Sequence, residues 1–159
     1  MDAAHVFATW LHTIAFVIAW GYYGVLGRII LPALERSLEG RARAAALLAI
    51  ERRAIPLILL ALVLFTVTGS YLLLGDPQYQ GLGNLFATTW TKLIAIKHVV
   101  VVGFVVLAAL IDWMIRRAPD PDDADDHGPA FDLIGLAADG VTGLGALIAL
   151  LTVAAQASE

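Results

Sequence analysis

The sequence predicts an all-α integral membrane protein, a four-helix bundle whose N and C termini both lie outside. Apolar residues make up 60% of the 159 residues and charged residues only 15%, against about 25% charged residues in an ordinary soluble domain. The mean hydropathy is +0.81. The apolar residues fall in four long runs, each near or above the roughly 20 residues needed to cross the hydrocarbon layer. We therefore expect a single multi-pass domain over residues 1–159, located in the plasma membrane.

The predicted spans are residues 5–34, 55–74, 91–115 and 131–155. The first span follows Met1 and Asp2 without the Lys/Arg-rich segment that opens a signal peptide, so we expect it to be retained. A charged connection with a helix-forming stretch at 41–50 leads into the second span, where Pro56 predicts a bend. The loop at 116–130 is acidic and contains proline, a composition typical of a solvated linker.

The placement of Lys and Arg predicts the orientation of the spans. The second connection and both tails hold no basic residue. The first and third connections hold seven arginines: Arg36, Arg41, Arg43, Arg52, Arg53, Arg116 and Arg117. Cytoplasmic loops carry the excess of positive charge. The first and third connections are therefore predicted to be cytoplasmic, with Trp10 and Trp90 at the outer interface and Trp113 at the inner one. The net charge of −4 gives no basic surface for nucleic acid, so the expected partner is the lipid bilayer.

Two histidines are predicted to lie at the same depth in the membrane. His12 and His98 each follow the outer start of their span by seven residues, which places both about 10 Å below the outer surface. Two imidazoles on different helices are what a haem iron or a copper ion requires. His5 lies two turns above His12 on the same face, which suits a further ligand or a point where metal enters. Lys92 and Lys97 lie near this level and could pair with anionic groups such as haem propionates.

Other polar residues in the spans have structural and functional interpretations. Tyr23 lies on one helical stripe with His12, which could line a flat cofactor or form an aromatic packing seam. Arg28, Asp112 and Asp139 are predicted to lie near the cytoplasmic face. Arg28 could pair with either aspartate, and Asp112 could instead pair with Arg116 one turn later. We interpret these residues as structural charge pairing within the bundle.

Three segments together resemble the CopD copper-resistance membrane domain. They are HTIAFVIAWGYYGVLGRIILPALE, RRAIPLILLALVLFTVTGSYLLLG and ATTWTKLIAIKHVVVVGFVVLAALIDWMIRR. The resemblance covers residues 11–117 and rests on a first helix with histidine and tryptophan, a Thr-Gly-x-Tyr-like end to the second helix and an early lysine in the third. It implies a role in copper handling, by transport or homeostasis.

The architecture also resembles the HemJ-type haem-pathway membrane proteins. Their first-helix histidine and third-helix lysine would correspond to His12 and Lys97. The sequence departs from that family because it lacks a second histidine late in the third helix. It departs from copper transporters because its only methionines are Met1 and Met114 and it has no cysteine, whereas Cu(I) prefers these soft ligands.

Three function classes therefore stay open from the sequence. The first is a CopD-like protein for copper handling, with His12, His98 and His5 as a metal site near the outer face. The second is a membrane protein with haem b, in which His12 and His98 are axial ligands and Lys92 or Lys97 pairs with the propionates. It would serve electron transfer or haem synthesis. The third is a structural subunit that binds a membrane or extracytoplasmic partner protein. The sequence does not assign an enzymatic activity.

Overall fold

The structure, a computed structural model, describes residues 2–117 and 128–158. In this part of the chain four helical segments are long and apolar enough to cross a membrane: Ala3–Ser37, Gly40–Gly75, Thr89–Arg116 and Phe131–Gln156. The first consists of α1 (Ala3–Val25), a π-helical turn η1 (Leu26–Ile30) and α2 (Leu31–Ser37). The others belong to α3 (Gly40–Gly75), α4 (Thr89–Arg116) and α5 (Gly128–Gln156). The chain is thus an all-α multi-pass membrane protein with four candidate spans.

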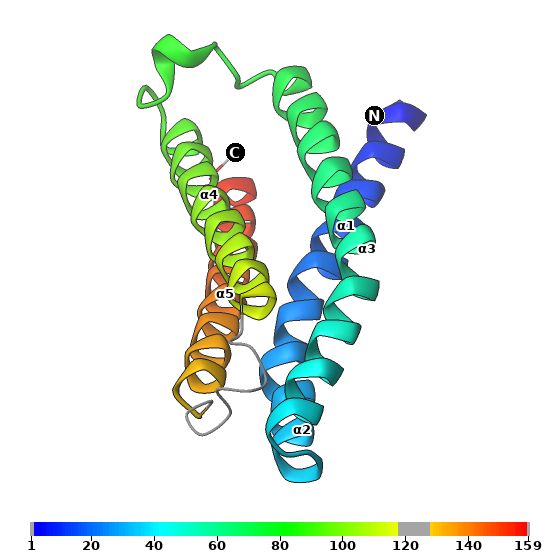
Figure 1. Cartoon of the computed structure of the whole chain (residues 1–159). Helices are drawn as coiled ribbons and strands as arrows, with labels where there is room; N and C mark the ends of the chain where they lie inside the picture. The colour runs from blue at the N-terminus through cyan, green and yellow to red at the C-terminus, as the bar shows by residue number, and fades with distance from the viewer. Residues whose placement is uncertain (1, 118–127, 159) are drawn as a thin grey trace.

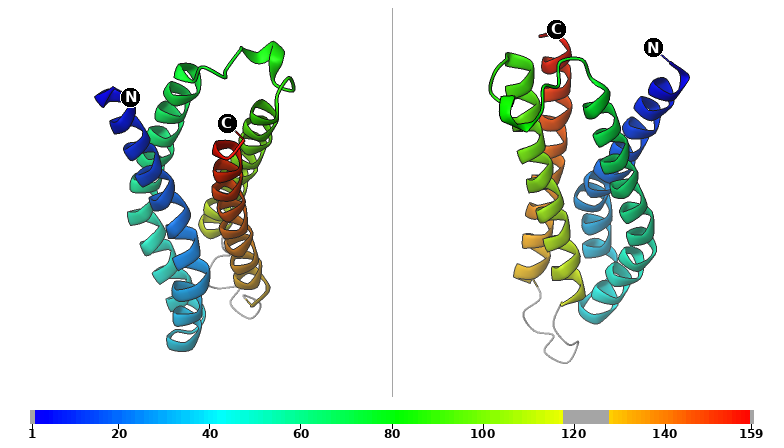
Figure 2. Two further views of the ribbon diagram at one scale, coloured as in Figure 1. Left: turned by 180° about the vertical axis from the view of Figure 1, so that it is seen from behind. Right: turned by 90° about the horizontal axis from the view of Figure 1, so that it is seen from above.

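The helices associate as two pairs. α1 packs along α3, and α4 packs along α5, while α1 also contacts α5 (Figure 1). Both termini lie at the same end as the connection between α3 and α4, which contains a short 3-10 turn, η2 (Leu82–Asn84). Figures 1 and 2 show that the two pairs diverge toward this end and approach each other toward the α2–α3 turn. The side of the membrane that each end faces is inferred from the placement of Lys and Arg in the connections.

The boundaries of the elements confirm one expectation from the sequence and correct another. The helix-forming stretch at 41–50 belongs to the same helix as the second span, which begins at Gly40 and continues through Pro56. A proline removes one backbone hydrogen bond, but packed membrane helices tolerate it. In the loop predicted at 116–130, residues 118–127 lie outside the described part of the chain, and residues 128–130 already belong to α5.

Two of the three tryptophans predicted as interfacial anchors have exposed side chains. Trp10 is 70% exposed near the start of α1 and Trp113 is 50% exposed near the end of α4. Trp90 is instead only 5% exposed, because its side of the first turn of α4 faces the protein while Thr89 and Lys92 are exposed. Its neighbour Thr91 forms a capping box with Thr88 that fixes the beginning of this helix. Trp90 therefore packs inside the protein and is not a lipid-facing anchor.

Close contact between α1 and α5 depends on small residues. The Trp20 indole of α1 donates a hydrogen bond of 2.9 Å from Nε1 to the carbonyl oxygen of Thr142. Its ring occupies the space that a side chain at Gly145 would need. Within the π-helical turn, a Cβ at Gly27 would lie 3.1 Å from that of Ala138. The two helix pairs are thus joined where glycine lets the backbones approach.

Gly145→Ala should lower the thermal unfolding temperature in detergent micelles, because the added methyl group would overlap the hydrogen-bonded Trp20 ring. Overpacking of this kind costs about 1–3 kcal/mol. Gly143→Ala is the matched control on the same helix, since its methyl group would meet no described atom within 4 Å. Equal unfolding temperatures for the two variants would contradict this account of the α1–α5 contact.

Candidate functional site

His12 is held between α1 and α3 by its Nδ1 atom. Nδ1 lies 3.0 Å from the carbonyl oxygen of Phe65 and 3.0 Å from Thr68 Oγ1. The Thr68 hydroxyl donates its own hydrogen to the carbonyl oxygen of Leu64, so both neighbours of Nδ1 act as acceptors. The imidazole ring also stacks on the Phe65 ring at 4.2 Å between centroids. These contacts require the proton of the neutral ring to sit on Nδ1, which leaves the lone pair of Nε2 free.

Gly69 on α3 makes the space that the His12 ring occupies. A Cβ atom built at Gly69 would lie 2.8 Å from His12 Cε1, closer than real side chains approach. Together with Phe65 and Thr68, this glycine forms a fitted cradle for one orientation of the ring. The fit is the arrangement expected of a histidine whose second nitrogen serves as a ligand.

Lys97 and His98 of α4 both lie within electrostatic reach of His12. Lys97 is partly buried and His98 is exposed. His98 Nδ1 lies 2.7 Å from the carbonyl oxygen of Ile94 in its own helix, so its Nε2 is also left without a described partner. Lys97 and His98 are thus close enough to influence the charge of His12, although the exposed His98 ring is bonded to its own helix.

The other predicted outer residues lie apart from His12. His5 lines an open hollow of about 450 Å³ near the start of α1, together with Asp2, Tyr71, Leu74 and Gly75. Lys92 is exposed in the first turn of α4. Tyr23 is buried and meets the Phe104 ring edge-on at 6.0 Å, about 16 Å along the axis of α1 from His12. In this position Tyr23 forms part of the apolar packing in the inner half.

The charged residues predicted in the spans form two ion pairs. Arg28 Nε lies 3.4 Å from Asp139 Oδ1, which joins the π-helical turn to α5. Asp112 pairs with Arg116 one turn later on α4, at 2.7 Å. The Arg28–Asp112 pairing that the sequence also allows is not formed. Both aspartates therefore have a cationic partner, and Arg28–Asp139 adds a polar link between α1 and α5.

Sequence reasoning missed the pair formed by Tyr22 and Glu51. Glu51 is completely buried on α3, and its Oε2 accepts a hydrogen bond from the Tyr22 hydroxyl of α1. The residue lies in a segment that looks like a charged connection because Arg52 and Arg53 follow it directly. Its position one turn before the apolar run was the available signal, since a long amphipathic extension of α3 would turn it inward.

Within residues 2–117 and 128–158, no three His, Asp or Glu side chains come together as a group that could hold a metal ion. No family model matches the chain, and no curated protein or solved structure matches it either. The resemblances to CopD-like and HemJ-type proteins stay predictions from the sequence.

Neutral His12 should carry its proton on Nδ1, because Phe65 and Thr68 offer only acceptors to that atom. Solid-state ¹⁵N NMR of histidine-labelled protein in lipid, above the pH at which the ring is charged, distinguishes the two tautomers. The His12→Gln variant assigns the resonance by its disappearance. A proton found on Nε2 would show that the cradle does not hold the ring in this way.

Proposed function

We propose that this chain is a membrane haem-binding protein that holds haem b in the outer half of the bundle, with His12 Nε2 as an axial ligand. The observation that carries the proposal is the hydrogen bond from His12 Nδ1 to the Phe65 carbonyl oxygen. Ligand histidines in proteins almost always donate their other ring N–H to a carbonyl or carboxylate, which sets the tautomer and makes the ligand nitrogen more basic. The Gly69 cradle supports the same role.

The donor set fits a haem better than a copper ion held by the protein alone. A haem supplies four nitrogen ligands itself and asks the protein for only one or two. His12 meets this requirement alone, and the Nε2 atom of His98 has no described partner and would be the candidate for a second axial position. A copper site would need further protein ligands, and the described residues bring no three such side chains together. Copper handling stays a prediction from the CopD resemblance alone.

Lys97 favours an anionic cofactor near His12. Its ammonium group is partly buried, lies within electrostatic reach of the imidazole and has no described carboxylate partner. A haem propionate would supply the missing negative charge. Deeper in the bundle, the enclosed space beside Phe65 is only about 30 Å³. A macrocycle would therefore not fit at this point, and His12 and Lys97 would hold it nearer the end of the bundle that contains the termini.

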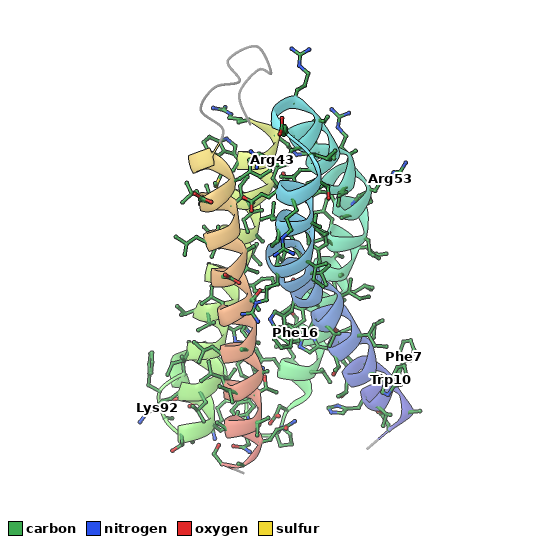
Figure 3. The ribbon with its side chains drawn as sticks, turned by 90° about the horizontal axis from the view of Figure 1, so that it is seen from below. Phe7, Trp10, Phe16, Arg43, Arg53 and Lys92 are labelled. Carbon is green, nitrogen blue, oxygen red and sulfur yellow. The ribbon has the colours of Figure 1, made fainter. Side chains whose placement is uncertain are left out.

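We also propose that both termini and His12 face the outer side of the membrane. The end opposite the termini carries all seven arginines of the first and third connections. In Figure 3, Arg43 and Arg53 lie at this end, while Lys92 lies toward the other. Because cytoplasmic loops carry the excess of basic residues, this end is assigned to the inner side. A haem held there would provide reversible one-electron chemistry near the outer surface, for electron transfer or a step of haem synthesis.

The absorption spectrum and metal content of protein purified from haem-supplemented cells test this proposal. We expect a Soret band and about one iron per chain, with the band lost in His12→Ala and weakened in Lys97→Ala. His5→Ala is the control and should retain the band, because His5 lies apart from the cradle. His98→Ala reports on the second axial position through the spin state of the iron.

Other results would overturn the proposal. Copper at about one ion per chain without a Soret band would support the CopD-like alternative. A protein that binds neither haem nor copper would support a structural subunit that acts through a membrane or extracytoplasmic partner. A Soret band that persists in His12→Ala would show that another residue binds the haem iron.

A further inference from the structure

A fully buried carboxyl group lies in the inner half of the bundle, away from the proposed haem site. Glu51 of α3 has no exposed surface. Its Oε2 accepts the hydrogen bond from the Tyr22 hydroxyl, and Tyr22 in turn packs against Tyr23 at 5.1 Å between ring centroids. Its Oε1 is also buried but has no hydrogen-bond partner among the described residues. One carboxyl oxygen therefore has a hydrogen-bond partner and the other has none among the described residues.

No described cation forms an ion pair with this carboxyl group. On α4, Asp112 and Arg116 lie within electrostatic reach of Glu51, but Arg116 is bound to Asp112 at 2.7 Å. On α3 itself, the Arg43 guanidinium lies 4.3 Å from the Phe131 ring centroid of α5. The remaining ionisable groups that face the carboxyl are the two tyrosines of α1, and the acidic side chains of α5, Asp132 and Asp139, are exposed.

A carboxylate in these surroundings would be costly. Burying an ionised carboxyl group without an ion pair costs several kcal/mol, and an unpartnered oxygen adds to that cost. The neutral acid avoids most of the cost. A proton on Oε1 also leaves Oε2 as the carbonyl oxygen, which is the atom that accepts from Tyr22.

We propose that Glu51 and Tyr22 form a proton-binding site, in which Glu51 Oε1 carries a proton that exchanges with the inner aqueous side. The depth of Glu51 along the bundle supports proton exchange with that side. The next two residues, Arg52 and Arg53, are exposed, and Figure 3 shows Arg53 pointing away from the bundle. Glu51 thus lies at the depth of the inner interface although its side chain points inward.

The site is separated from the outer half by apolar packing. The small cavity on the way to His12 is lined mostly by apolar side chains, among them Phe16, Leu62, Val101 and Phe104. No polar chain of described residues crosses this layer. The proton is therefore loaded and released at one end of the bundle, and the inference does not rest on the proposed haem binding.

Infrared spectroscopy of the full chain in lipid bilayers tests the proposal. At neutral pH we expect the C=O band of a protonated carboxylic acid, which moves to lower wavenumber when the sample is transferred to ²H₂O. The band should vanish in Glu51→Gln. It should rise in wavenumber in Tyr22→Phe, because the carbonyl then loses its hydrogen bond. Asp132→Asn is the matched control and should leave the band unchanged, because Asp132 is exposed on α5 and does not act on Glu51.

Three results would overturn the proposal. A wild-type spectrum without the band would show that Glu51 is ionised, and a band that persists in folded Glu51→Gln would assign it to another group. A band that does not move in ²H₂O would show that the proton does not exchange with water. Glu51→Gln imitates the neutral acid, and if this variant fails to fold, an unchanged band in Tyr22→Phe overturns the proposal instead. None of these readouts requires a bound haem.

Discussion

The structure depends on the need of polar side chains in the first span to find partners inside the protein, because the hydrocarbon layer offers none. The first span carries several of these groups, and four of its polar side chains meet a residue of α3 or α5. His12 meets the Phe65 carbonyl oxygen, Trp20 the Thr142 carbonyl oxygen, Tyr22 the Glu51 carboxyl group and Arg28 the Asp139 carboxylate. The shorter Thr9 and Thr13 are satisfied by carbonyl oxygens of their own helix.

These contacts make the first span the element that joins the two helix pairs. Its partners on α3 hold one pair together, and its partners on α5 connect that pair to the other. Glycine makes the contacts possible, because Gly69 gives room to the His12 ring and Gly145 to the Trp20 ring. The π-helical turn at Leu26–Ile30 adds an extra residue to one turn of the helix. It lies where Arg28 reaches Asp139, which indicates that the turn helps to direct that side chain.

The spans could be predicted from the sequence because they depend on hydropathy. A run of about 20 apolar residues is long enough to cross the hydrocarbon layer as a helix. The matched depth of His12 and His98 stays a prediction, because it rests only on the rise per residue from the start of each span. Which way each side chain turns depends on the rotation of its helix against its neighbours. For that reason the sequence left open whether Tyr23 lines a cofactor or packs in a seam, and it placed Trp90 at the interface although that side chain is buried.

Glu51 shows the same limit in another form. Charged residues beside a span are normally solvated, and Arg52 and Arg53 follow that rule. Glu51 does not, because α3 continues as a regular helix back to Gly40 and places this position against α1. Only the length of the helix and the partner helix beside it distinguish the buried acid from its exposed neighbours, and neither is visible in local composition.

The two ends of the bundle therefore have different chemistry. The half that contains the termini offers a histidine nitrogen without a described partner within electrostatic reach of a lysine. The half that contains the α2–α3 turn offers a buried acid that accepts a hydrogen bond from a tyrosine. We propose that the contacts of α1 leave His12 Nε2 free to bind iron. The position of the iron in crystals of the haemin-loaded protein, located by anomalous X-ray scattering, tests this claim directly. The account predicts iron within bonding distance of His12 Nε2, and iron bound elsewhere, with Nε2 hydrogen-bonded to a protein group, would contradict it.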